Sequence, residues 1–552
     1  MDFVSRGVVV PGEGNQFVED AKEEEGEADQ ARESLYEQLS RTIKEKRENR
    51  IDGKPEEFAL EDQEFVNQIK RHKDEHYRQV AKQDKEEFKR QKLLIVPQPV
   101  VAAVAQASKE KEEEEEPAPV FIKRKKKTHY LFAHAQVGNI MSRVLPIPIP
   151  RVVDGEGSTA RMAELCRELG ITKVFIVTDA IIRKLGLIDQ AVSSLQASGI
   201  PFVIFDQVLP DPTDLVCDLG FALYQAERCN GIVCVGGGSV MDCAKLIGAK
   251  TTNPLKDSKY FMQTLGLYPF YQIPPFIAVP TTAGTGSETT IAAVISFPSE
   301  RKKYTLIDPS ICPKIAVLDP KLLVGLPKQI TAPTGMDALT HAVESFLSPW
   351  RTDFTAKYSK DAVRAVFLYL KRSYDNGGDL EARNGMLLAS FNAGVAFTRA
   401  NVSYVHAIAH QLGALYHTPH GEANAIVLPH LLDFYLDTCV ADLAELGRVI
   451  GLGADKSEAE LAKGFVQAVK QLNLDLNISP IIKHFPQGDV DLVATRARNE
   501  AHGDTFRFSE NPIKYLMDTG YPLAKFLPEA DCKKILNKLV DPQANQQQQS
   551  KL

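Results

Sequence analysis

Histidine and aspartate residues spaced four apart in the second half of the chain are the residues best suited to chemistry. Asp337 and His341 form one such pair, His406 and His410 form a second, and His420 follows within Pro-His-Gly. Residues four apart lie on one face of a helix, so both members of a pair can point into one site. One carboxylate with several imidazoles suits a divalent first-row metal such as Fe²⁺ or Zn²⁺. The spacing predicts a metal site, which taken alone also fits a metallohydrolase.

A glycine-rich segment follows an apolar run and precedes an expected helix at residues 235–245. Gly237 and Gly238 have no β-carbon, so the backbone there can approach a pyrophosphate closely. The amide groups at the start of the helix would add hydrogen bonds and partial positive charge, and Ser239 adds a hydroxyl. The segment indicates a phosphate-binding turn, with a tight structural turn as the alternative.

Two further segments could contact a dinucleotide. Thr281 and Thr282 follow another apolar run and precede an Ala/Gly/Thr stretch, so their hydroxyls could donate to phosphate or nicotinamide; a loop packed on a helix is the alternative. Asp179 ends the apolar run at 174–177, where a carboxylate could hold a ribose diol and repel a 2′-phosphate. Asp179 therefore favours NAD over NADP as the cofactor, although an aspartate at the end of a strand is more often a helix cap.

The elements that must position these residues change character along the chain. Strands are expected at 174–177, 202–205, 232–235, 276–279 and 315–318, and they alternate with helical segments. Continuous apolar strands between helices predict a mostly parallel sheet that is covered on both faces. The histidines that could bind a metal fall in later, helical sequence. We expect an α/β domain at 128–325, an all-helical domain at 326–541 and a disordered tail at 542–552.

In chain order, these motifs resemble the iron-containing, group III alcohol dehydrogenase family. The match runs from about residue 155 to at least 512. The motifs are Gly-Gly-Gly-Ser-x-x-Asp-x-x-Lys, Pro-Thr-Thr-Ala-Gly-Thr-Gly-Ser-Glu, Gly-Met-Asp-Ala-Leu-Thr-His-Ala-x-Glu, His-Ala-x-Ala-His-x-Leu-Gly and Pro-His-Gly-x-x-Asn-Ala. The resemblance implies a Rossmann-like dinucleotide domain followed by an all-helical, dehydroquinate-synthase-like domain, with the active site between them. It also implies NAD, a divalent metal (Fe²⁺ before Zn²⁺), a small alcohol or aldehyde substrate, and a homodimer or larger assembly.

The resemblance assigns roles residue by residue. Asp337, His341, His406 and His420 match the family's metal ligands, and His410 matches a further histidine that we expect to carry a proton to solvent. The chain departs from the common pattern at Val240, where many members have Pro, and at Asp211, where many have Asn. The positions that match the family's NAD contacts are Asp179, Gly237, Gly238, Ser239, Thr281, Thr282 and Lys303.

Other enzymes of the same architecture are the nearest alternatives. They are a glycerol dehydrogenase, a hydroxyacid–oxoacid transhydrogenase and a lyase like dehydroquinate synthase. The complete Asp/His/His/His set and the His-Ala-x-Ala-His motif favour an alcohol dehydrogenase. An alternative of another class is an interaction protein that acts through its amino-terminal extension.

That extension, residues 1–127, has 55 charged residues in 127 positions, more than twice the charge density of the rest. Its narrow apolar stripes predict disorder or isolated helices that could bind a protein partner. Residues 34–39 and 60–65 resemble the amino-terminal domain of a nuclear family that includes the protein interacting with the gamma proteasome activator. Five basic residues at 123–127 could be a nuclear localisation patch or a solvated charge cluster.

Composition limits the remaining classes. A formal net charge of -7 gives no reason to expect nucleic-acid binding. The eight cysteines are scattered, which is typical of reduced thiols in a cytosol-like compartment. The first thirty residues are acidic and no apolar run reaches membrane-spanning length, so a secretory signal, a transit peptide and a membrane span are not expected. We expect a cytoplasmic protein, or a nuclear one if the basic run is read as a signal.

Overall fold

The computed structural model describes residues 147–263, 273–300, 302–453, 455–502 and 524–544. The predictions made for residues 1–127, including the basic run and the second family resemblance, lie outside these ranges. Within the described residues, no helix combines the length and apolar character that crossing a membrane requires.

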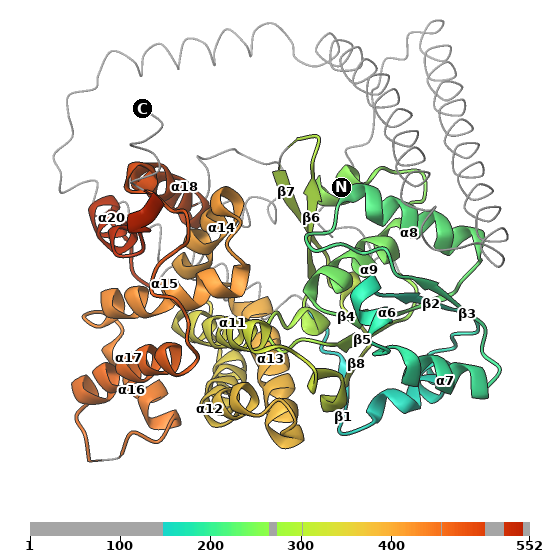
Figure 1. The fold of residues 1–552 in the computed structure, drawn as a ribbon, viewed down its shortest axis with the longest axis horizontal. Coiled ribbons are helices and arrows are strands. Elements are labelled where there is room, and N and C mark those ends of the chain that lie inside the picture. Colours follow the sequence, from blue (N-terminus) through green and yellow to red (C-terminus); the bar gives the residue numbers. More distant parts are fainter. Residues whose placement is uncertain (1–146, 264–272, 301, 454, 503–523, 545–552) are drawn as a thin grey trace, which may run out of the picture. The chain divides into compact units, whose positions relative to one another are not determined.

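The first half of the described chain forms a six-stranded sheet in which all strands run parallel (Figure 1). Its strands are apolar and mostly buried, as expected for a sheet covered on both sides. The five predicted strands are all present, and three of them keep their predicted bounds. In spatial order the strands are β1 (Arg151–Asp154), β8 (Ile315–Leu318), β5 (Phe276–Pro280), β4 (Gly231–Gly236), β2 (Val174–Val177) and β3 (Phe202–Phe205).

Helices cover both faces of this sheet. Phe175 and Val177 belong to one apolar cluster, whereas Val174 and Ile176 belong to the other, because successive side chains of a strand point to opposite faces. Helices α8 and α9 lie on one side and α7 on the other (Figure 1). The helical elements of this half are η3 (Ser158–Arg161), α5 (Met162–Glu168), α6 (Ala180–Lys184), α7 (Asp189–Ala197), α8 (Asp214–Ala226), α9 (Gly238–Lys250), α10 (Ser258–Gln263), η4 (Ser287–Thr289), η5 (Pro309–Ile311) and η6 (Pro320–Leu323).

Three strands were not anticipated. Strand β1 is a partly exposed edge strand that pairs with β8. Strands β6 (Ala292–Phe297) and β7 (Lys302–Ile307) form a separate antiparallel hairpin. The hairpin matters for the site, because β7 carries Lys303.

The second half is all helical, as predicted. Helix α11 lies at its centre and packs against α12, α13 and α15; its side chains are buried almost without interruption from Gly335 to Leu347. The elements are α11 (Lys328–Leu347), α12 (Asp353–Asp375), α13 (Leu380–Ala400), α14 (Tyr404–Tyr416), α15 (His420–Tyr435), α16 (Val440–Val449), α17 (Glu458–Asp475), η7 (Gln487–Asp489), α18 (Val490–His502) and α20 (Glu529–Asn537).

The loop between β5 and η4 joins the two halves. A β-carbon on Gly284 would lie 2.6 Å from the carbonyl oxygen of Thr334 on α11, so only glycine permits this approach. Two residues later, the Gly286 amide donates to the Ser390 hydroxyl on α13 at 3.1 Å. The threonine-rich loop is therefore fixed against the helix that carries Asp337.

Candidate active site

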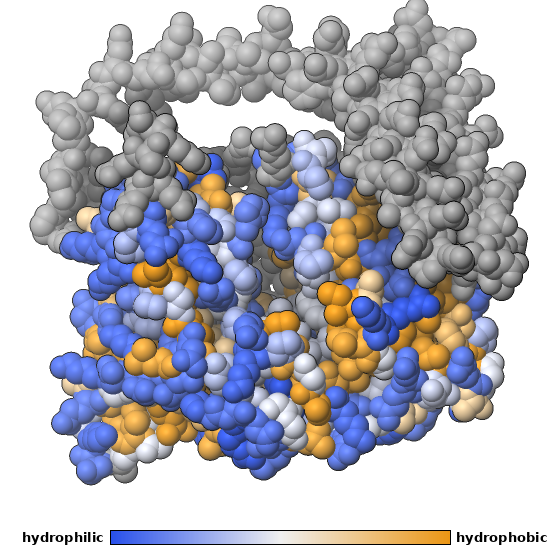
Figure 2. Space-filling view, in the orientation of Figure 1, coloured by the Kyte–Doolittle hydropathy of each residue, from blue (hydrophilic) through white to orange (hydrophobic). Residues whose placement is uncertain are grey.

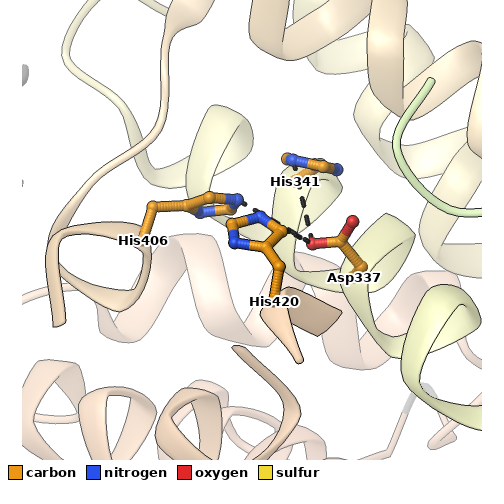
Figure 3. Close-up of side chains that lie close together, drawn as sticks. All are labelled: Asp337, His341, His406 and His420. Atoms are coloured by element: carbon orange, nitrogen blue, oxygen red, sulfur yellow. Dashed lines mark ion pairs between the residues drawn. The ribbon is translucent and has the colours of Figure 1, made fainter. Parts of the chain in front are cut away.

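Four side chains from three helices converge in the helical half (Figure 3). Asp337 and His341 come from α11, His406 from α14 and His420 from α15. One nitrogen or oxygen atom from each lies within 4.8 Å of the others. Asp337 Oδ1 is 3.9 Å from His341 Nε2, 3.9 Å from His406 Nε2 and 3.6 Å from His420 Nε2. The structure thus brings together all four predicted ligands.

Local sequence explains each position. Asp337 and His341 are four apart on α11, so they share its inner face. His420 is the first residue of α15, and Pro419 at the cap sets the direction in which the helix starts. A β-carbon on Gly421 would lie 2.5 Å from the carbonyl oxygen of Pro333, so the glycine lets the start of α15 approach α11.

The donor set fits a divalent metal. Bonds of about 2.1 Å from a tetrahedral ion place its ligand atoms about 3.4 Å apart, close to the separations of 3.6 and 3.9 Å. The Asn424 amide nitrogen lies 2.7 Å from Asp337 Oδ1 and 3.2 Å from both His406 Nε2 and His420 Nε2. One amide nitrogen thus lies within hydrogen-bonding distance of three ligand atoms, so these three atoms face a common centre.

The rings are held by packing. His341 stacks on Phe397, with ring centroids 4.1 Å apart, and on His406 at 4.7 Å. Burial lowers the pKa of both histidines, which keeps the imidazoles neutral at pH 7, the form that binds a metal.

His410 lies one helical turn beyond His406 and is not part of the four-residue cluster. Its ring stacks on that of His420 at 5.3 Å, and its Nδ1 is 2.5 Å from Glu500 Oε1. Burial lowers the pKa of His410 and the charge of Lys303 adds to this, but Glu500 outweighs them and the net pKa is raised. Gln411 donates to the other Glu500 oxygen at 2.6 Å.

The two predicted phosphate-binding loops lie against each other. Gly237 caps α9 and Gly238 begins it, and β-carbons there would lie 3.3 Å from the Thr282 hydroxyl and 3.0 Å from Thr285, respectively. Thr281 continues from β5, and its amide donates to the Gly236 carbonyl at 3.1 Å. Backbone amides of a helix start and small hydroxyls therefore meet at one edge of the sheet, at the carboxyl ends of β4 and β5.

Asp211 connects two other predicted cofactor residues. Its carboxylate lies 2.7 Å from the Lys303 ammonium, and its amide donates to the Ser239 hydroxyl at 3.3 Å. Asp179, at the end of β2, accepts a hydrogen bond from the Ile182 amide at 2.8 Å. The alternative interpretation of Asp179 as a helix cap is thus correct for α6.

Two charged residues of α9, the fully buried Lys245 and the partly buried Asp242, hold the surroundings of these loops. The Lys245 ammonium donates to Ser287 and Thr290 hydroxyls at 2.9 and 2.7 Å, and to the Ala292 carbonyl at 2.8 Å. Asp242 accepts from the Ser287 hydroxyl at 3.1 Å and from the Val294 amide at 3.0 Å. This network attaches η4 and β6 to the glycine-rich helix.

Sequence reasoning missed the residues that support the site. They are Glu344, Asn424 and Glu500, together with Phe397. Glu344 and Asn424 stand inside recognised motifs, three residues after His341 and four after His420, so helical spacing was a signal for both. Nothing in the sequence pairs Glu500 with His410, 90 positions away.

Comparison with known proteins agrees with this geometry. The family model "Iron-containing alcohol dehydrogenase" matches residues 149–320, and the model of the C-terminal part of the same family matches residues 331–511. The chain is 37% identical to the 1,3-propanediol dehydrogenase of Klebsiella pneumoniae over 328 residues, which are 59% of this chain and 84% of that protein. The chain belongs to the iron-containing alcohol dehydrogenase family.

Other members of this family support the assignment. The NAD-dependent methanol dehydrogenase of Bacillus methanolicus is 33% identical over 63% of this chain and 91% of its own length. A crystal structure of a 1,3-propanediol oxidoreductase superposes with a TM-score of 0.66 and 32% identity, covering 72% of this chain and 99% of that one. This iron-containing alcohol dehydrogenase is accordingly an oxidoreductase that interconverts alcohols and aldehydes, and its fold is that of its relatives.

Proposed function

We propose that this protein oxidises a small alcohol, or reduces the corresponding aldehyde or ketone, with NAD and a divalent metal, Fe²⁺ before Zn²⁺. Asp337, His341, His406 and His420 would hold the metal. The observation that carries this proposal is the convergence of four ligand atoms within 4.8 Å, three of them on buried side chains. On this proposal residues 128–325 bind NAD and residues 326–541 hold the metal.

The chemistry needs a polarised substrate oxygen beside a hydride acceptor. When bound, the metal would stabilise negative charge on that oxygen, and NAD would accept or deliver the hydride. The protein holds the two reactants in place. The loop at Gly284 contacts Thr334 of α11, three residues before Asp337, so the nucleotide side and the metal side are held at a fixed spacing. Figure 2 shows the surface hollowed between the α14 and α18 side and the β6 and β7 side, where a substrate could enter.

NAD would lie along the carboxyl ends of β2, β4 and β5. Gly237, Gly238 and Ser239 would bind the phosphates with the amides that begin α9. Thr281 and Thr282 would contact phosphate or nicotinamide. Lys303, on strand β7 of the β6–β7 hairpin, would also contact the cofactor. Asp179 would hold the adenosine ribose, where its charge disfavours a 2′-phosphate.

His410 is our candidate for moving the substrate proton to solvent. Its side chain is 41% exposed, whereas that of the neighbouring His406 is 3% exposed. It therefore lies between the metal centre and water, and Glu500 fixes its ring. A histidine placed there can take up and release protons near neutral pH.

The direct test uses the full-length protein, stripped of metal and reloaded with Fe²⁺ or Zn²⁺ under anaerobic conditions. We expect NADH to form only after the metal has been reloaded. Suitable test alcohols are 1,3-propanediol and methanol, after which two relatives are named. Activity of the stripped protein equal to that of the loaded one would contradict the metal assignment.

His406→Ala tests the ligand set. Removing one of four ligands should abolish most metal binding and activity while the sheet stays folded, since the change removes no residue of the nucleotide half. Metal content by mass spectrometry and circular dichroism check this. Full metal occupancy in a well-folded variant would refute the assignment of His406.

A further inference from the structure

Glu344 is a buried carboxylate on the same face of α11 as the two ligands of that helix. It follows Asp337 by seven residues and His341 by three, which places all three side chains along one side of the helix. Its side chain is 2% exposed. Such burial is costly for a carboxylate unless each oxygen has a partner.

Both oxygens of Glu344 have a partner on α14. Oε2 lies 2.5 Å from His406 Nδ1, and Oε1 accepts a hydrogen bond from the Val405 amide at 2.8 Å. Val405 is in the first turn of α14, where helix amides lack intrahelical acceptors. The residue at the usual capping position, Ser403, makes no side-chain cap hydrogen bond. Glu344 therefore caps α14 from a different helix.

We propose that Glu344 is a positioning residue of the metal centre, which fixes the tautomer and direction of His406 by accepting the Nδ1 proton while it caps α14. This inference rests on the proposed metal site. A histidine that donates from Nδ1 carries its lone pair on Nε2. His406 Nε2 is the atom that faces the cluster, 3.9 Å from Asp337 Oδ1 and 3.2 Å from the Asn424 amide.

A carboxylate fits both contacts. With the His406 proton on Nδ1, that N–H and the Val405 N–H are both donors, so the side chain between them needs two acceptor oxygens. Glutamine offers one oxygen and one NH₂ group, which leaves one donor facing another donor. The positive end of the α14 dipole also favours a negative group at this position.

The contacts of Glu344 also hold two helices together, in addition to setting the tautomer of His406. Glu344 ties the start of α14 to α11, and α14 carries both His406 and His410. Loss of this tie should let the His406 ring rotate and change the geometry of the ligand set, because among the described side chains Glu344 is the one that hydrogen-bonds His406 Nδ1.

The experiment measures metal affinity of the full-length chain by competition with a chromophoric chelator, using Zn²⁺ and Co²⁺. Glu344→Gln should weaken binding by about 10- to 100-fold and alter the visible spectrum of bound Co²⁺, which reports ligand geometry. Glu344→Asp keeps the charge but is one methylene shorter, so we expect a smaller loss. Ser345→Ala, next to Glu344 on α11, is the matched control: it removes buried hydrogen bonds to Ala342 of α11 and Ser359 of α12 and should leave metal affinity unchanged.

Each outcome decides between the roles. Wild-type affinity and spectrum in folded Glu344→Gln, even with lower thermal stability, would overturn the proposal and leave Glu344 a structural residue. If that variant does not fold, Glu344→Asp carries the test, and unchanged affinity there overturns it equally. His406→Ala, measured alongside, separates the two claims: retained metal in that variant refutes the proposed metal site itself, whereas its loss beside full binding in Glu344→Gln refutes only the role of Glu344.

Discussion

Asp179 illustrates how one side chain can serve a structural and a chemical purpose. It caps α6 through the Ile182 amide, and under our proposal its charge also excludes the 2′-phosphate of NADP. We expect NAD to give a higher kcat/KM than NADP. Replacing Asp179 by Ser keeps a capping oxygen and removes the charge, so the preference should narrow with little change in stability.

Asp179→Gly is the companion variant, because glycine at a cap costs only a few tenths of a kcal/mol. Steady-state kinetics with both cofactors check the prediction. A preference of the unmodified enzyme for NADP would show that Asp179 does not contact the ribose.

Glu500 gives a prediction about pH. It raises the pKa of His410 against the opposing effect of burial. A raised folded-state pKa means that the pair stabilises the fold fully below the unfolded histidine pKa of about 6.5, and this stability is lost as pH rises through the folded pKa. Glu500→Gln should therefore reduce the free energy of unfolding more at about pH 6 than at about pH 9. Urea unfolding at the two pH values checks this, and an equal loss at both would contradict it.

At the scale of elements, α9 connects the cofactor loops through Lys245. Lys245→Met keeps a side chain of similar length but removes three hydrogen bonds and the positive charge beside the partly buried Asp242. We expect a loss of about 2 to 4 kcal/mol in unfolding free energy. The KM for NAD should rise, because η4 and β6 would no longer be fixed to the glycine-rich turn.

The metal side supplies the control for this variant. The four ligands lie on α11, α14 and α15, which Lys245 does not touch, so metal affinity per folded molecule should stay at the wild-type value. Calorimetric titration with NAD and chelator competition measure the two sites separately. An unchanged KM for NAD would mean that the hydrogen bonds of Lys245 contribute to stability alone.

At the scale of the whole molecule, the charged extension is predicted to be separate from catalysis. Residues 1–127 contain too little apolar sequence to supply a substantial part of the enzyme's core. Deleting them keeps Ile147 and Pro148, whose carbonyls accept from Arg399 on α13. We expect kcat/KM within a few-fold of the full-length value and little change in thermal stability.

Size-exclusion chromatography of both forms tests the alternative that the extension covers a subunit interface. The proposed homodimer, or larger assembly, should survive the deletion. An inactive or dissociated truncated protein would show that residues 1–127 belong to the enzyme.

The sequence alone determined the features that depend on local spacing. Apolar runs identified five of the six strands of the parallel sheet, the four inner strands and the edge strand β3, because a strand buried on both faces needs continuous apolar residues. The four-residue spacing of Asp337 and His341 placed both on one helix face. The edge strand β1 and the hairpin strands β6 and β7, which are all partly exposed, were not predicted.

Tertiary structure alone decided which helices meet. Glu344 and His406 are 62 positions apart, and His410 and Glu500 are 90 apart, so no local periodicity relates them. Their pairing depends on how α11, α14 and α18 pack, which the summed burial of many apolar side chains sets. The ligand types were therefore evident in the sequence, whereas the carboxylates that orient the histidines became evident only once the helices were packed together.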